Sequence, residues 1–491
     1  MSRGWWWFFL VGGGFVAIIL AVLFASQQVA IATGIASVGA WIAFGFYTSW
    51  RFGLRRHVQA HLGPRWNLGE VLRHRARTAE RVNLQLALDW LQERTGTLGP
   101  FGVRHATNYD EEGDEVGGYQ GLELVALLEG NPEPVAIVWE PLPTSTEETM
   151  HCASNALYLI RVGNEPVCVF IQGRSSQSSK RATLQLLARN QETARTSLNE
   201  ILRLANEQSV YRGQVISLVR PRGQTTDLIV QFHDIRRVER DQIVLPEAVL
   251  GIIERNVLGF FRHAEALRQA GQGTRHGVLL HGPPGTGKTL VTRYLATNVG
   301  ATVLLVTGRQ YSLLRATCQL ARLLAPSLVV LEDVDLIATD RRRNAHTPLM
   351  HELLDEMDGI AAGADIVFLL TTNRPETLEP ALAARPGRVD QAIFFPLPDL
   401  ECRRELFQRF GEGLNVRGIN FTSLLARTEG ASPAFLRELF RRATLMAVER
   451  GEKTEPLTLR LDDFERGLRE LVETGGALTR TFLGFPTRPA N

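Results

Sequence analysis

Two uncharged apolar runs dominate the hydrophobic pattern at the start of the chain, over residues 5–25 and 29–50. Each run has about the 20 residues that a membrane-spanning helix needs. Only a short polar stretch separates them, and small residues such as Gly34 allow two membrane helices to approach closely. The pattern therefore predicts a transmembrane helical hairpin over residues 1–50, with a single span followed by an amphipathic segment as the alternative.

Arginines flank this predicted hairpin on both sides. Arg3 precedes the first run, and residues 51–81 contain eight arginines against two glutamates. Positive charge near both ends of a hairpin places both ends in the cytoplasm. We expect a basic juxtamembrane helical segment over residues 51–98, with its clearest helical pattern near residues 76–97. Its charge either attracts anionic membrane lipids or only sets the topology.

The middle region, residues 99–230, alternates short apolar runs with one long amphipathic pattern. Gly163-Asn164 supplies a turn between two of the runs, as in a hairpin. No paired nucleophile and base occur at a telling spacing, so we expect a small α+β domain with an adaptor or spacer role. The expected strands cover residues 122–128, 135–139, 156–162, 167–171, 214–219 and 227–232, and the expected helix covers residues 180–206.

From residue 231 the pattern changes to buried strands that alternate with helices. Continuous apolar runs at residues 277–281, 327–331 and 366–370 are typical of strands that are covered on both faces. Residues 399–475 show successive helical patterns instead. This half of the chain therefore predicts an α/β domain followed by a helical one.

A glycine-rich turn follows the first of these strands and opens a helix near Lys288. Glycines let the backbone fold around phosphate oxygens with several N–H groups pointing inward, and the helix N-terminus adds about half a positive charge. Lys288 can reach the β- and γ-phosphates, and the Thr289 hydroxyl can ligate Mg²⁺. The turn predicts a nucleoside triphosphate site formed by Gly282, Pro283, Pro284, Gly285, Thr286, Gly287, Lys288, Thr289 and Leu290.

Two acidic residues, Glu332 and Asp333, end the second buried strand of this region. An apolar strand that ends in two carboxylates places one near Mg²⁺ and the other near the γ-phosphate, where it could polarise the attacking water. The third strand leads into a polar stretch that contains Asn373. These residues are candidates for the chemistry of triphosphate hydrolysis.

Composition narrows the classes of function only slightly. The formal net charge of +2 argues neither for nor against nucleic acid, but residues 231–475 carry no basic-aromatic stripe, which disfavours a nucleic-acid motor. The four cysteines are far apart and form no CxxC motif, so we expect buried thiols in a reducing compartment. The His351-Glu352 pair lacks the second histidine of an HExxH zinc site.

Together these motifs resemble those of the AAA ATPases over roughly the last half of the chain. The resemblance implies an α/β P-loop NTPase fold, with a nucleotide-binding α/β subdomain built on a parallel sheet over residues 231–398, a helical lid over 399–475 and a tail over 476–491. It also implies ATP and Mg²⁺ as the bound nucleotide and ion. A homo-oligomeric ring, with six subunits expected, follows from the same resemblance.

The resemblance assigns roles to particular residues. Asn373 matches the sensor residue that hydrogen-bonds the γ-phosphate or the water, while Arg385 and Arg388 match the arginine fingers that reach the nucleotide of a neighbouring subunit. The family usually has Asp before Glu at the end of the second strand, and here the order is reversed. By position, Glu332 holds the metal and Asp333 acts on the water.

One departure from the family pattern concerns residues 307–315. This stretch is shorter than in peptide-threading members and lacks their aromatic–apolar–glycine tripeptide. Together with the Glu-Asp order and the entry at residues 243–247, it resembles the mitochondrial Rieske-protein translocase branch, whose members are membrane-anchored ahead of a middle domain. Since no mitochondrial presequence is visible, we expect a bacterial relative in the inner membrane, with its ATPase domain in the cytoplasm.

The sequence as a whole predicts a membrane-anchored, ring-forming ATPase that couples ATP hydrolysis to the remodelling or translocation of a protein client. The alternative is an ATP-dependent assembly switch or scaffold at the membrane, without client translocation. Expected partners are further copies of the chain, a protein client and membrane lipids, and nucleic acid is not expected. Steady ATPase activity stimulated by a client would favour the motor over the switch.

Overall fold

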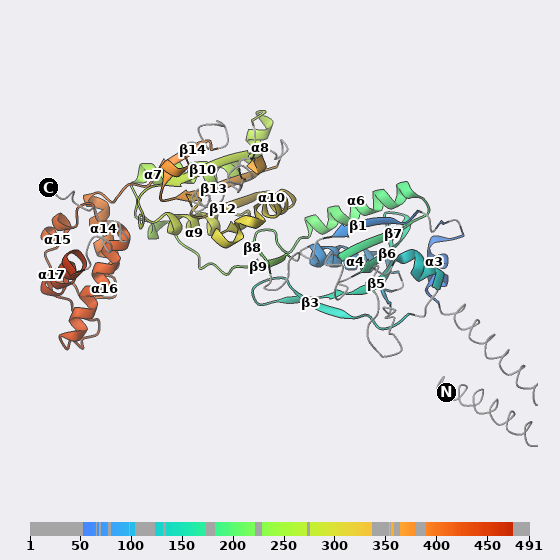
Figure 1. The fold of residues 1–491 in the computed structure, drawn as a ribbon, viewed down its shortest axis with the longest axis horizontal. Coiled ribbons are helices and arrows are strands. Elements are labelled where there is room, and N and C mark those ends of the chain that lie inside the picture. Colours follow the sequence, from blue (N-terminus) through green and yellow to red (C-terminus); the bar gives the residue numbers. More distant parts are fainter. Residues whose placement is uncertain are drawn as a thin grey trace, which may run out of the picture. The chain divides into compact units, whose positions relative to one another are not determined.

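A computed structural model describes residues 53–64, 66–67, 70–76, 80–97, 99–103, 123–130, 134–172, 182–220, 228–272, 275–335, 353, 355–357, 364–378 and 389–474. The chain forms two compact units, residues 1–142 with 149–208 and residues 143–148 with 209–491 (Figure 1). The predicted transmembrane hairpin at residues 1–50 lies outside the described residues. In the part of the chain that is described, no helix combines the length and apolar character needed to cross a membrane.

The first unit is built on a five-stranded antiparallel sheet with the order β1-β7-β6-β5-β2. Its side chains alternate between two cores, because successive residues of a strand point to opposite faces. Helices α4 and α6 cover one face, and helices α3 and α5 cover the other. The strands are β1 (Leu72–Ala76), β2 (Phe101–Gly102), β5 (Asn155–Val162), β6 (Glu165–Gln172) and β7 (Ala182–Leu187); the helices are α3 (Leu54–Leu62), α4 (Arg81–Thr95), α5 (Leu124–Gly130) and α6 (Gln191–Glu207); and β3 (Trp139–Pro143) pairs with β4 (Thr149–Ala153) in a separate ribbon.

Four expected elements of the first unit have a different structure. The helical segment expected over residues 51–98 contains strand β1 between helices α3 and α4, and β1 pairs with β7 in the sheet. The strand expected at residues 135–139 has only an isolated bridge at Val135 before β3 begins at Trp139.

The run at residues 122–128 was expected as a strand but forms helix α5, whose Leu124, Leu127 and Leu128 share one face at helical spacing. The expected helix over residues 180–206 begins instead with strand β7, and only its second part forms α6. Strand β7 does alternate, with Ala182, Leu184 and Leu186 apolar and Thr183 and Gln185 polar between them, but it is short and lies just before the longer amphipathic pattern of α6.

The second unit contains a seven-stranded sheet with the order β14-β10-β13-β12-β11-β8-β9. All neighbours are parallel except β8 and β9, which form an antiparallel hairpin at one edge. The expected runs at 277–281, 327–331 and 366–370 are all strands of this sheet. The strands are β8 (Val215–Val219), β9 (Ile229–Phe232), β10 (Arg275–His281), β11 (Thr302–Val306), β12 (Ser327–Leu331), β13 (Ile366–Thr372) and β14 (Gln391–Phe394).

Hairpin β8–β9 corrects the domain boundary expected near residue 230. Both strands were assigned to the middle domain, yet β8 pairs with β11, with Val215 opposite Val303 and Ile216 opposite Leu304. The first compact unit ends instead at Gln208. Sequence periodicity identifies a strand but carries no information about its partner, which explains why the boundary was misplaced.

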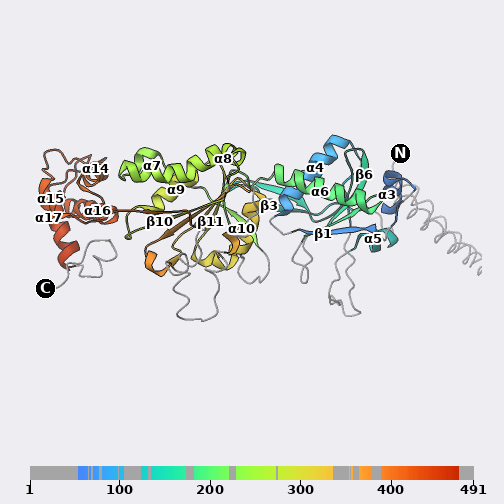
Figure 2. The ribbon, with the colours of Figure 1, turned by 90° about the horizontal axis from the view of Figure 1, so that it is seen from above.

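Helices cover both faces of the second sheet (Figure 2). Helices α7 and α9 pack on one face in a common core, and α10 packs against β11 and β12 on the other. The elements around the sheet are η3 (Arg240–Gln242), α7 (Glu247–Glu254), the π-helical turn η4 (Arg255–Gly259), α8 (Phe260–Gln269), α9 (Lys288–Asn298), the 3₁₀ helix η5 (Gly308–Leu313), α10 (Leu314–Leu323) and η7 (Pro375–Thr377).

The C-terminal part of this unit is helical, as the sequence predicted. Phenylalanines from three of its helices, among them Phe407, Phe440 and Phe464, form an edge-to-face aromatic cluster in its core. The helices are α14 (Leu400–Phe410), α15 (Thr422–Arg427), α16 (Pro433–Glu449), α17 (Leu461–Arg469) and the π-helical turn η8 (Glu470–Thr474).

Candidate functional site

The glycine-rich turn lies between the buried strand β10 and the start of helix α9. Gly282 and Gly285 have positive φ angles of 150° and 76°. A Cβ on Gly282 would lie 2.4 Å from the Phe395 carbonyl oxygen, and one on Gly285 would lie 2.8 Å from the Ala434 Cβ. Both positions therefore require glycine, for backbone angle and for space. The turn therefore encloses a space lined by backbone atoms, which a side chain at either glycine would fill.

Lys288 points back into this turn. Its ammonium nitrogen Nζ donates to the carbonyl oxygens of Gly282 at 2.9 Å and Pro283 at 2.8 Å, and the residue is 6% exposed. Burial lowers the pKa of Lys288 to about 8, and the nearby Asp333 and Asp335 partly offset this effect. The ammonium therefore keeps its charge at neutral pH and lies where phosphate oxygens could replace the two carbonyls.

Asp333 and Asn373 meet beside the turn, as the ends of neighbouring parallel strands should. The Asn373 Nδ2 donates to Asp333 Oδ1 at 3.3 Å. Both residues line a cavity of about 520 Å³ together with residues 284–291 of the turn and helix. The Asp333 side chain is exposed to solvent, so water can reach the carboxylate. Partial burial and the neighbouring Asp335 raise its pKa, while Lys288 lowers it.

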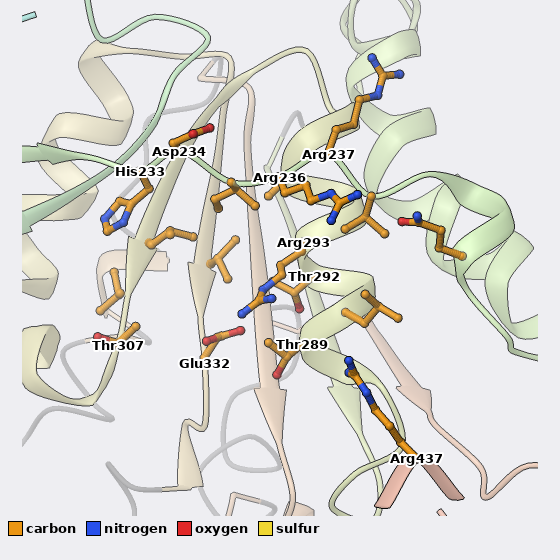
Figure 3. A pocket seen from close by; sticks show the side chains of 18 residues that line it. His233, Asp234, Arg236, Arg237, Thr289, Thr292, Arg293, Thr307, Glu332 and Arg437 are labelled. Carbon is orange, nitrogen blue, oxygen red and sulfur yellow. The ribbon is translucent and has the colours of Figure 1, made fainter. Parts of the chain in front are cut away.

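Glu332 lines a second cavity, of about 720 Å³, on the same unit. Figure 3 shows its carboxylate beside the guanidinium of Arg293, with Thr289 close by on helix α9. Burial, and then the charge of Asp333, raises the pKa of Glu332, whereas Arg293 lowers it. Thr289 lines both cavities, so the two carboxylates approach the nucleotide-binding turn from different sides.

The helical C-terminal part closes the first cavity. The Ala434 N–H donates to the Gly285 carbonyl oxygen at 3.2 Å, and Pro433, Ala434 and Arg437 line the cavity. The Ser432 hydroxyl caps helix α16 by accepting from the Phe435 N–H. The stretch at residues 430–434 therefore contacts the glycine-rich turn directly, which is the position expected of a lid.

Asp335 was not assigned a role from the sequence. Its Oδ1 accepts hydrogen bonds from the Thr372 hydroxyl at 2.9 Å and from the Asn373 N–H at 3.3 Å. The carboxylate therefore fixes the backbone that carries Asn373. The sequence shows this third acid two residues after Asp333. Its role could not be predicted, because its hydrogen-bond partners Thr372 and Asn373 lie at the end of another strand, β13.

Several expected residues lie outside the described part of the chain. They are Arg385 and Arg388, together with the His351-Glu352 pair. The four cysteines, Cys152, Cys168, Cys318 and Cys402, are buried and unbridged, as expected of buried thiols.

Thr289 and Glu332 supply the hydroxyl and carboxylate oxygens that suit Mg²⁺. Within the described ranges, no group of three or more His, Cys, Asp or Glu side chains could hold a metal ion. Mg²⁺ in phosphate-transfer sites is usually held by one or two protein ligands, substrate phosphates and water. The residues present therefore fit a Mg²⁺ ion that arrives with the nucleotide.

Comparison with known proteins finds similarity to one family over the region that contains this site. Residues 278–397 match the model of the ATPase family associated with various cellular activities (AAA). Over 230 residues the chain is 35% identical to a 26S proteasome regulatory subunit 6B homolog of Encephalitozoon cuniculi, covering 43% of this chain and 58% of that protein.

Two further relatives cover similar parts of the chain. A proteasome-activating nucleotidase of Thermococcus kodakarensis is 32% identical over 259 residues, which are 50% of this chain and 62% of the relative. The human ATPase family gene 2 protein homolog A is 32% identical over 235 residues, which are 45% of this chain and 25% of the relative. The chain thus spans less than two thirds of the length of each of these relatives.

Proposed function

We propose that this chain is a membrane-anchored, ring-forming ATPase that remodels or translocates a protein client. Its residues 278–397, which match the AAA family model, would bind ATP with Mg²⁺ and hydrolyse it. The observation that carries the proposal is the cavity in which Lys288, Asp333 and Asn373 meet beside the glycine-rich turn. In this cavity the Lys288 ammonium, which can bind phosphate, lies near the Asp333 carboxylate, which water can reach.

Each side chain of the site has its own role in ATP hydrolysis. The Lys288 ammonium and the inward backbone N–H groups of the turn bind and orient the phosphates. Asp333 orients the attacking water and accepts its proton, and Asn373 holds one oxygen of that carboxylate in place. Thr289 and Glu332 would hold Mg²⁺, which supplies positive charge to the phosphate oxygens when bound.

The second part of the proposal is that several copies of the chain form a ring and that this ring acts on a protein client. The relatives' names, a proteasome regulatory subunit and a proteasome-activating nucleotidase, support an action on proteins. In a ring, Arg385 and Arg388 would reach the nucleotide of the neighbouring subunit and neutralise charge that develops in the transition state.

Mixing two inactive variants tests the ring directly. Arg388→Ala subunits keep Lys288, and Lys288→Ala subunits keep Arg388, so a mixed ring contains some interfaces with one intact site and one intact finger. We expect each variant alone to be inactive and the mixture to regain ATPase activity in a steady-state phosphate-release assay. If mixed rings form and no activity returns, Arg388 does not act across a subunit boundary.

Membrane anchoring rests on the uncharged runs at residues 5–25 and 29–50. We expect a protein that lacks residues 1–50 to leave the membrane fraction while keeping its ATPase activity, provided that the ring still assembles. Centrifugation after an alkaline carbonate wash measures the partition, with the full-length chain as the control. A truncated protein that stayed in the washed membranes would refute the hairpin anchor. In the proposed topology the ATPase domain lies in the cytoplasm at a bacterial inner membrane.

The mode of action on the client is proposed from residues 307–315. They form the 3₁₀ helix η5 followed by the start of α10, and Tyr311, the aromatic residue of this stretch, is only 5% exposed. A buried tyrosine does not grip a passing peptide. This arrangement supports a likeness to the Rieske-protein translocase branch, which we propose as a functional relative.

An assembly switch that uses ATP without moving a client is the alternative function. The two hypotheses differ in their turnover, because a motor hydrolyses ATP continuously and a switch does so once per assembly event. Identifying the proteins that remain bound to a hydrolysis-deficient variant, and then measuring ATPase activity with and without them, decides between the two. A steady rate that the captured protein raises supports the motor, whereas one turnover per assembled ring supports the switch.

A further inference from the structure

We infer that Tyr311 and Thr371 are positioning residues that hold the peptide bond between Glu332 and Asp333 and thereby aim the Asp333 carboxylate at the attacking water. The inference rests on the proposed role of Asp333 in hydrolysis. It adds two side chains, one from η5 and one from β13, to which neither the sequence motifs nor the family resemblance gave a role.

Both polar groups of this one peptide bond are held by side chains. The Tyr311 hydroxyl donates to the Glu332 carbonyl oxygen. On the other side of the same peptide, the Asp333 N–H donates to the Thr371 hydroxyl oxygen at 3.0 Å. The peptide plane is therefore fixed from two directions, by elements that are distant in sequence from β12.

The backbone on either side is held by ordinary strand contacts. The Glu332 N–H donates to the Val306 carbonyl oxygen at 3.3 Å, and the Val334 N–H donates to the Thr371 carbonyl oxygen at 2.9 Å. Strand β12 pairs with both β11 and β13 as far as Leu331, and just beyond it Glu332 still bonds to β11 whereas Val334 bonds to β13. The clamped peptide bond lies past the end of the regular pairing, where the strand register no longer sets the direction of the backbone.

Asp333 has a backbone conformation that needs such support. Its φ angle is +55°, and it is the only non-glycine residue with a positive φ in the described ranges. The left-handed region is disfavoured for residues with a Cβ, and it persists where the surroundings impose it. We infer that the two side-chain contacts impose it here, since they act on the peptide that precedes the Asp333 Cα.

Tyr311 is well placed to keep its contact. It is 5% exposed, and burial raises the pKa of its hydroxyl well above the usual range, so the group stays protonated and remains a donor. Helix η5, which carries Tyr311, begins with a capping box formed by Thr307 and Gln310. The Gln310 Nε2 also donates to the Ser217 hydroxyl of β8 at 3.2 Å, which ties η5 to the neighbouring strand.

Removing the tyrosine hydroxyl alone tests the inference. Tyr311→Phe keeps the buried ring and deletes the donor, so the Glu332 carbonyl oxygen loses its side-chain partner. We expect kcat to fall about tenfold, because an unsatisfied buried acceptor shifts the geometry that it had fixed. The KM for ATP should change less than about twofold, since Lys288 and the turn are untouched. Thr371→Val should act in the same way from the other side, while Thr371→Ser, which keeps the hydroxyl, should restore most of the rate.

Tyr294→Phe is the matched control for a purely structural effect. The Tyr294 hydroxyl also makes a partly buried hydrogen bond, to Glu254 Oε1 at 2.6 Å, but it does not contact the Glu332–Asp333 peptide. Both tyrosine variants should lower the thermal midpoint of unfolding by similar amounts, and only Tyr311→Phe should lower kcat. The inference is overturned if kcat of Tyr311→Phe stays within about twofold of the natural protein, or if Thr371→Ser is as slow as Thr371→Val.

The same measurements separate this inference from the proposal on which it rests. If Asp333→Asn keeps its hydrolysis rate, the role of Asp333 fails and the inference fails with it. If Asp333→Asn is slow and Tyr311→Phe is fast, Asp333 keeps its role and only the clamp is wrong. A slow Tyr311→Phe with a normal KM, beside a fast Tyr294→Phe, supports both.

Discussion

A Lys288→Ala variant should bind ATP at least about 30-fold more weakly than the natural protein. The ammonium is the cation that the glycine-rich turn encloses, and it is nearly fully buried against the carbonyl oxygens of Gly282 and Pro283. Removing one partner of a buried charge contact costs about 2–5 kcal/mol, which lowers affinity by about 30- to 5,000-fold. Isothermal titration with ATP and Mg²⁺ measures the loss.

Lys453→Ala is the matched control, because Lys453 is an exposed lysine of the same unit. It should bind ATP as the natural protein does. The Lys288→Ala protein must also keep its far-ultraviolet circular dichroism, since the lysine holds two carbonyl groups of the turn. A folded Lys288→Ala protein with unchanged affinity would show that the triphosphate binds elsewhere.

The second large effect is expected for Asp333→Asn, which should still bind ATP but hydrolyse it about 10²–10⁴ times more slowly. An asparagine can still accept the contact from Asn373, yet it cannot take a proton from water. Single-turnover hydrolysis with prebound ATP separates the chemical step from binding.

Glu332→Gln separates the roles of the two acids. If Glu332 serves the metal, this variant should need more Mg²⁺ to reach its full rate, whereas Asp333→Asn should keep a normal Mg²⁺ dependence. Asp462→Asn, a change at an exposed aspartate of helix α17, is the control and should alter neither property. A Glu332→Gln protein that binds ATP normally and does not hydrolyse it would reverse the assignment of the two acids.

Local sequence patterns predicted the parts of the site that lie close together along the chain. The turn from Gly282 to Thr289 works through its own backbone and the helix that follows, so the motif contains most of the necessary information. Strand β12 and its two terminal acids were found for the same reason. In each case the physical cause is a run of consecutive residues.

Long-range contacts were not predictable in this way. The roles of Tyr311, Thr371 and Asp335 arise from hydrogen bonds to residues 20 to 40 positions away, where no periodicity or spacing gives a signal. The positive φ of Asp333 was equally hidden, because aspartate does not mark a left-handed position as glycine does. In the first unit, the helix expected over residues 180–206 includes β7, because the short alternating run at residues 182–187 lies just before the longer amphipathic pattern of α6.

The β8–β9 hairpin has a consequence for how the chain can be divided. Without it, the backbone N–H and C=O groups along the free side of β11 would be exposed, and such an edge readily pairs with another chain and aggregates. Within the described ranges, the hairpin moves the edge to β9, a strand of four residues that carries the polar Gln231. We therefore expect that a fragment of the second unit should begin near residue 209, because a fragment cut at residue 231 would leave the backbone groups at the edge of β11 unpaired.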